Sequence, residues 1–163
     1  MECDKAAGPI IFLLRGWRIR NGERRVLKKG GLLIAAGISR FSCTTWALSK
    51  YGRENNFIDD DIYMNMLRHE LETGEHIRPT EYPFFIADAY FHTPDGMKSE
   101  FLDNGFEVIN YHAVEGSVWI TPALEEKWND ASSRERLLDI IRATEHEASM
   151  MGMSPHFLMI GRK

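Results

Sequence analysis

Cysteine is scarce in this sequence of 163 residues. The two cysteines, Cys3 and Cys43, form no Cys-x-x-Cys pair and are too few for a disulfide scaffold, so we expect a reducing compartment, the cytoplasm. Long apolar runs are lacking too. The early apolar run over residues 9–14 is shorter than the roughly 7–15 residues of a signal-peptide core, and no run approaches the length of a membrane span. The sequence therefore predicts neither a secretory leader nor a transmembrane helix.

Familiar catalytic and metal-binding motifs are also missing. The sequence has no Gly-x-Ser-x-Gly elbow, no phosphate loop and no Cys-His signature, which leaves hydrolase classes without support. His69-Glu70 begins like a zinc-binding helix, but Thr73 stands where the second histidine must lie one turn later. His146 has Met150 at the same spacing and fails in the same way. We therefore expect no metal.

The composition is that of one globular domain spanning residues 1–163, with 44% hydrophobic and 27% charged residues. Charge is uneven, because residues 1–29 carry eight basic and three acidic side chains, whereas the rest of the chain is acidic. Such a basic segment could contact a nucleic acid or a membrane, or it could be a solvated helix face. Since no aromatic platform or recognised binding motif accompanies it, we expect no nucleic-acid and no membrane partner.

The chain is organised around a helix stop followed by an apolar run. Lys28-Lys29 suits the negative end of a helix dipole, and Gly30-Gly31 allows the left-handed backbone that ends a helix. Residues 32–38 are then almost entirely apolar, which is typical of a strand covered on both faces. This helix, stop and strand unit predicts the α/β class.

Further elements follow from local signals. Three acids, Asp59 to Asp61, precede a helical pattern that ends at Gly74, so they indicate a helix start. The residues expected to face the core from this helix are Ile58, Ile62, Met66, Leu67 and Leu71. Thr93-Pro94 predicts the start of a second helix, and Ser132 or Ser133 the cap of a third. Strands are expected at 106–112 and 156–161.

At several of these positions the sequence resembles the class I S-adenosylmethionine (SAM) dependent methyltransferases. The matching segments are 27–34, with Lys29 in place of the proline of the family's Leu-x-Pro-Gly-Gly stop, then 90–94, 105–108, 114–116 with Trp119 and Pro122, and 156–163. The resemblance covers the C-terminal half of such an enzyme. It implies a partial Rossmann-like sheet with flanking helices whose last strand is antiparallel to its neighbour.

The N-terminal part departs from the family. Gly8, Pro9 and Leu13 match a family segment and, by the resemblance, Gly8 and Pro9 would contact the cofactor. Gly16 and Asn21-Gly22 then interrupt the amphipathic helix that should follow, so residues 1–25 are atypical. Residues 1–26 contain no Gly-x-Gly and are fewer than the roughly 30 residues of one βαβ unit, so we expect this chain alone not to bind SAM.

The resemblance implies methyl transfer to an unknown small-molecule acceptor. Because a sulfonium methyl is already activated, the protein need only align the acceptor and sometimes remove its proton. The residues predicted to do this, as catalytic groups, are Tyr90, His92 and Glu115. The predicted substrate-binding residues are Ser39, Arg40, His76, Phe91 and Trp119. For each tyrosine or histidine the alternative is a buried side chain satisfied by the backbone, and Ser39 or Ser42 could instead cap a helix.

Two descriptions of the whole chain follow. It is a methyltransferase-like protein that is impaired or inactive in this truncated form, or it is a non-catalytic remnant or interaction module that does not bind SAM. In either case a sheet that lacks its early strands leaves an exposed edge, and exposed edges pair with other chains. Self-association is therefore expected.

Overall fold

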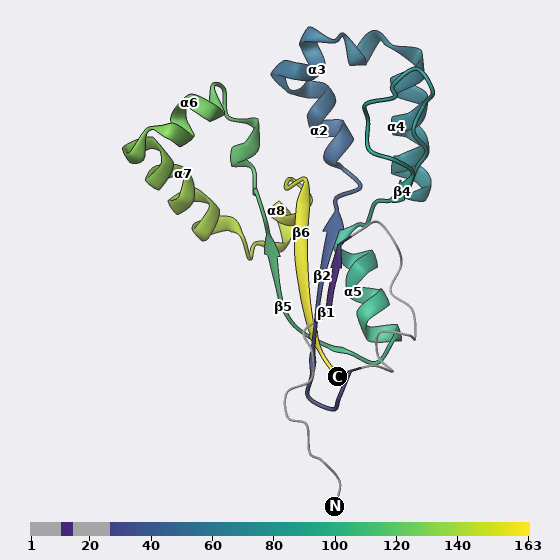
Figure 1. Cartoon of the computed structure of the whole chain (residues 1–163), viewed down its shortest axis with the longest axis vertical. Helices are drawn as coiled ribbons and strands as arrows, with labels where there is room; N and C mark the ends of the chain where they lie inside the picture. Colours follow the sequence, from purple (N-terminus) through teal and green to yellow (C-terminus); the bar gives the residue numbers. More distant parts are fainter. Residues whose placement is uncertain (1–10, 15–26) are drawn as a thin grey trace, which may run out of the picture.

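The computed structural model describes residues 11–14 and 27–163 (Figure 1). The predicted cofactor residues Gly8 and Pro9 lie outside the described residues, as does most of the atypical segment 1–25. Within that segment the structure gives one strand, β1 (Ile11–Leu14).

A mixed sheet forms the centre of the protein. Its order is β1, β2 (Leu32–Ile38), β6 (His156–Arg162) and β5 (Glu107–Ala113). β1 and β2 are parallel, whereas β6 is antiparallel to both β2 and β5. The three predicted strands, the α/β class and the antiparallel last strand are therefore confirmed. β2 and β5 run in the same direction, so their carboxyl ends meet at one edge of the sheet.

Two glycines set the entry to β2. Gly30 has a φ of +80°, and its N–H donates to the carbonyl of Lys163 at 2.8 Å. Gly31 N–H donates to the Lys28 carbonyl at 2.9 Å, which closes the turn. Lys28 and Lys29 thus lie in a turn, and the helix that they were predicted to end falls on residues 15–26, outside the described residues.

The first hydrophobic core lies between the sheet and α5 (Pro94–Asp103), which begins as predicted with Thr93 Oγ1 accepting from Gly96 N–H at 3.0 Å. Alternate residues of β2 are buried in it and the others are half-buried, so the prediction of complete cover on both faces is wrong. The reason is that α5 packs against one face of the sheet (Figure 1), so the β2 side chains that point to that face are buried and those on the other face are only half-buried. The core residues are Leu27, Leu33, Ala35, Met97, Phe101, Phe106, Ala113, Met151, Phe157 and Met159.

A second core lies above the sheet among α2 (Ser42–Leu48), α3 (Lys50–Glu54), the 3-10 turn η1 (Phe57–Asp59) and α4 (Asp61–Thr73). Its buried residues are Cys43, Ala47, Phe57, Tyr63, Met66, Leu67 and Phe91. Asp60 caps α4 by accepting from the N–H groups of Ile62 and Tyr63, and Gly74 ends it with a φ of +83°, as predicted.

The face of α4 that enters this core differs from the predicted one. Ile62 and Leu71 are about 40% exposed, while Tyr63 and Glu70 are fully buried beside Met66. Tyr63 is drawn inward because its hydroxyl donates to the Cys43 carbonyl at 2.7 Å. Met66 and Leu67 are buried as predicted, whereas Ile58, Ile62 and Leu71 are exposed, so the buried face of α4 is shifted toward Tyr63 and Glu70.

The remaining elements are short or surface helices. After β5 come η2 (Val118–Ile120), α6 (Leu124–Asn129), α7 (Ala131–Thr144) and α8 (Ala148–Met151), while β3 (Glu75–His76) and β4 (Ala89–Tyr90) form a small ribbon. Asp130, rather than Ser132 or Ser133, caps α7, because its carboxylate accepts from Ser133 N–H. Within residues 27–163 and the short strand before them, no helix combines the length and apolarity needed to cross a bilayer.

Candidate functional site

The candidate residues gather at one edge of the sheet, where β2 and β5 end and β6 begins. Two arms, α2–α4 and α6–α7, rise from this edge and diverge (Figure 1). Ser39 N–H donates to the Pro155 carbonyl at 2.8 Å, and Val114 N–H donates to the His156 carbonyl at 3.0 Å. The turn that leads into β6 therefore connects the ends of β2 and β5. Open α/β sheets bind their ligands at such an edge.

Ser39 is a buried residue that hydrogen-bonds the end of β2 to the turn before β6. Its hydroxyl donates to the Gly152 carbonyl at 3.1 Å and accepts from Phe41 N–H at 3.3 Å. The N-cap of α2 is Phe41, without a side-chain cap, so the alternative that Ser39 or Ser42 caps this helix is wrong. The physical reason is that Ser39 lies too far before α2 and bonds to the β6 turn instead.

Arg40 is held by the segment that follows α4. Its guanidinium donates to the Tyr90 hydroxyl at 3.0 Å and to the carbonyls of Thr73 and Phe91 at 3.4 Å. It also lies 5.8 Å from the centre of the Tyr90 ring. The structure thus brings together the predicted residues Arg40 and Tyr90, and a fixed cation stands at the end of β2.

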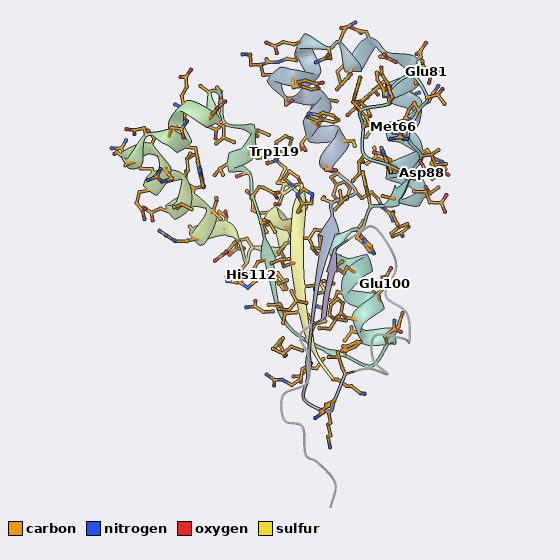
Figure 2. The ribbon with its side chains drawn as sticks, viewed as in Figure 1. Met66, Glu81, Asp88, Glu100, His112 and Trp119 are labelled. Carbon is orange, nitrogen blue, oxygen red and sulfur yellow. The ribbon has the colours of Figure 1, made fainter. Side chains whose placement is uncertain are left out.

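His92 lies beside this pair. Its backbone bonds to Ile38 and Arg40, which places it next to the end of β2. The ring is 1% exposed, and neither nitrogen has a hydrogen bond among the described residues. Nε2 is 3.5 Å from Oε2 of Glu100, which α5 presents beside the sheet (Figure 2).

His76 and Phe91 were predicted to bind substrate. Their side chains contact each other instead of lining the opening of a pocket. Their rings are stacked with centroids 4.9 Å apart, and both side chains are buried in or beside the second core. His76 Nδ1 lies 2.5 Å from Glu70 Oε1, and its Nε2 lies 3.1 Å from the Ile86 carbonyl. This arrangement matches the alternative of a histidine satisfied by its neighbours.

Glu115 and Trp119 form a separate group at the end of β5. Both line a cavity of about 660 Å³ with Val118, Trp128 and Ile141 among its apolar walls. Trp119, on η2 (Figure 2), donates its indole N–H to the Met153 carbonyl at 3.0 Å. The predicted catalytic residues are thus divided between two places, with Tyr90 and His92 at the end of β2 and Glu115 at the end of β5.

Glu115 is bound on several sides. Its Oε1 is 2.6 Å from His156 Nδ1, and its Oε2 accepts from His156 N–H and lies 3.0 Å from the Ser154 hydroxyl. Burial acts to raise the pKa of Glu115, but the hydrogen bonds and charge of His156 outweigh it and lower that pKa. The hydrogen bond to Glu115 raises the pKa of His156. At neutral pH Glu115 is therefore a carboxylate, suited to bind a cation and unsuited to donate a proton.

These opposite shifts predict a pH window for the pair. The stabilisation that protonated His156 gives the folded state is fully present below its ordinary pKa of 6.5. It is lost as the pH rises through the raised pKa of the folded state. Stability from Glu115 is complete above its ordinary pKa of 4.5 and is lost as pH falls through the lowered value. A double-mutant cycle with Glu115→Gln and His156→Gln should therefore give its largest coupling free energy between pH 4.5 and 6.5.

The expected coupling is small, because the two side chains are 32% and 49% exposed. Solvent screening limits it to about 0.5–1 kcal/mol, measured by urea unfolding. The coupling should fall toward zero at about pH 9. A coupling that does not change with pH would contradict the assigned charges.

Sequence reasoning missed Cys43, Glu70, Glu100 and Ser154. Cys43 and Glu70 were considered within local motifs, where neither has a partner, and Ser154 stands in a turn before the last strand. Ser154 is fully buried and accepts from the N–H groups of Glu115 and Gly116. A pattern confined to neighbouring residues contains no signal for contacts of this kind.

Comparisons with known proteins bring no relatives to this site. No protein-family model matches the chain, and no curated protein matches it.

Proposed function

We propose that this chain is the C-terminal half of a class I SAM-dependent methyltransferase-like protein with a partial Rossmann-like sheet. The observation that carries the proposal is the order of the strands that follow the glycine turn. β2 and β5 are parallel to each other, and the last strand lies between them and antiparallel to both. The resemblance implies a final strand of this orientation. Of the matching segments, 27–34, 105–108 and 156–163 include parts of these three strands.

The reaction proposed for the complete protein is transfer of a methyl group to a small-molecule acceptor. The acceptor would lie at the carboxyl ends of β2 and β5. Arg40, fixed by Tyr90, would orient it, and His92 would support this end of β2 from the buried side. Glu115 and Trp119 would bind the part of the acceptor that enters the cavity.

The described residues do not fit a SAM site. In the resembling family the cofactor rests on a glycine-rich turn after the first strand. The described residues from Leu27 onward match the later strands, and residues 1–26 contain no Gly-x-Gly. We therefore assign no step through the cofactor to these residues, and we propose that the chain alone is impaired or inactive.

Addition of SAM or its demethylated product to the purified chain should leave the melting temperature unchanged. A ligand at 100 times its dissociation constant stabilises a folded protein by about 2.7 kcal/mol, so binding would be visible in a thermal melt. A saturable rise of several degrees would show that the chain, or an assembly of it, contains a cofactor site.

A chimera tests the methyltransferase part of the proposal. Residues 1–25 are replaced by the SAM-binding half of a class I methyltransferase, joined before Leu27. The chimera should show the saturable rise with demethylated SAM that the chain alone lacks, because the strands from β2 onward would complete the sheet. A chimera that is folded by circular dichroism but binds no demethylated SAM would contradict the proposal.

The second candidate is a non-catalytic interaction module. The observation in its favour is the edge of the sheet, since β1 pairs on one side with β2 and with no other strand among the described residues. An open strand edge is a template for pairing with another chain. A module of this kind would bind protein partners and no SAM.

Self-association through this edge is the corresponding prediction. Light scattering should give a mass that rises with protein concentration. β5 is the other edge strand, so Ile109→Lys tells the two edges apart. Association through β1 should be unchanged by this charge, whereas its loss would assign the association to β5. A monomer at every concentration would contradict the prediction.

A further inference from the structure

Three metal-ligating side chains meet inside the second core. They are Cys43 from α2, Glu70 from α4 and His76 from β3, and their ligand atoms all lie within 4.8 Å of one another. The exposed fractions are 7% for Cys43, 0% for Glu70 and 2% for His76. The cluster is thus closed to solvent and joins three elements that are separate in the sequence.

The ring of His76 is already oriented for ligation. The Ile86 carbonyl can only accept, so the His76 nitrogen 3.1 Å away, Nε2, carries a proton. This leaves Nδ1 facing Glu70, and the stacked Phe91 ring fixes the plane of the imidazole. Histidines that bind metals commonly donate their other ring N–H to a backbone carbonyl in this way.

Glu70 supplies the second independent observation. Its Oε1 contacts His76, but its Oε2 has no hydrogen-bond partner among the described residues although the side chain is fully buried. A buried carboxylate oxygen without a partner is costly, so such atoms are usually paired or bound to a metal. A cation between Glu70, Cys43 and His76 would satisfy it.

We propose that Cys43, Glu70 and His76 form a structural zinc site. The ligands are Cys43 Sγ, His76 Nδ1 and the Glu70 carboxylate. Three residues leave one position of a tetrahedral zinc, and the second carboxylate oxygen of Glu70 would take it because the cluster is closed to solvent. A thiolate, an imidazole and a carboxylate together select Zn²⁺ over Mg²⁺ or Ca²⁺, which prefer oxygen ligands alone. Zinc would separate Nδ1 and Oε1, now 2.5 Å apart, to about 3.3 Å.

Zinc would be neutralised inside the core by the Cys43 thiolate and the Glu70 carboxylate. Burial and the charge of Glu70 raise the pKa of the Cys43 thiol, so a metal that binds there must displace the thiol proton. The apparent affinity for zinc should therefore rise with pH.

The zinc site would stabilise the arm α2–α4, which contacts Arg40. Phe91 links the two, since its ring stacks on His76 and its carbonyl accepts from Arg40. No open coordination position remains, so the metal has no catalytic part. This proposal is independent of the methyltransferase proposal and stands or falls on metal binding alone.

Cobalt is the spectroscopic probe. The purified full chain, titrated with Co²⁺, should develop a thiolate-to-cobalt charge-transfer band that saturates at one equivalent. Cys43→Ser should abolish the band, whereas Cys3→Ser, the matched control at the other cysteine, should retain it. The surface cluster His112, Glu145 and His146 could also take up cobalt, but it has no thiol and gives no such band. Absence of the band from the wild type, or its loss in Cys3→Ser alone, would overturn the proposal.

Zinc gives the second readout. Addition of Zn²⁺ should raise the melting temperature of the wild type by several degrees and that of Cys3→Ser equally. Glu70→Gln, which can still hydrogen-bond to His76, should lose the rise. Calorimetry in two buffers of different ionisation enthalpy should report proton release on zinc binding. A melting temperature of the wild type that zinc does not change would overturn the proposal.

Discussion

Phe157→Ala is expected to lower the free energy of unfolding by about 3–5 kcal/mol, the cost of removing a fully buried aromatic ring from a core. Phe157 is 0% exposed and lies in β6, which pairs with β2 on one side and with β5 on the other. Its ring lies over Gly37 of β2, where an added Cβ would come within 3.1 Å of it. Because Gly37 has no side chain, nothing on β2 can move in to fill the space left by the ring.

Phe84→Ala is the matched control for this prediction. Phe84 is 98% exposed, so the same substitution there should change the free energy of unfolding by no more than about 0.5 kcal/mol. Both values come from urea unfolding followed by circular dichroism. A loss at Phe157 of the size found at Phe84 would mean that β6 does not lie in the centre of the sheet.

Gly74→Ala should also destabilise the protein, by two effects. The φ of +83° at Gly74 costs a residue with a side chain about 1–2 kcal/mol. An added Cβ would in addition lie 2.8 Å from the Phe91 carbonyl and still closer to the Arg40 guanidinium. Because a backbone oxygen cannot move away cheaply, this overpacking should cost about 1–3 kcal/mol more.

Gly30→Ala separates the two effects. Gly30 has a similar φ of +80°, but no atom lies within 4 Å of the added Cβ. This substitution should therefore show the backbone cost alone, and the difference in unfolding free energy between the two variants measures the contact at Arg40. Equal losses would show that the end of α4 does not pack against Arg40 and Phe91.

The sequence by itself determined the elements whose cause is local. The apolar run of residues 32–38 predicted β2 with its observed bounds, because a strand is defined by its own side chains and the glycines before it. The start of α4 at the acid triplet, its end at Gly74 and the cap at Thr93 were predicted for the same reason. A cap or a glycine stop acts on backbone groups within one helical turn, so its signal stands next to its effect.

The tertiary structure alone decided which distant residues meet. The pattern of α4 placed Ile62 and Leu71 inside, but the hydrogen bond from Tyr63 to Cys43 directs Glu70 into the core. The path of the chain between the elements brings Glu70 to Cys43 and His76. The same path separates Glu115 from Tyr90 and His92. The free energy of such contacts arises between segments far apart in sequence, so no periodicity or short motif records it.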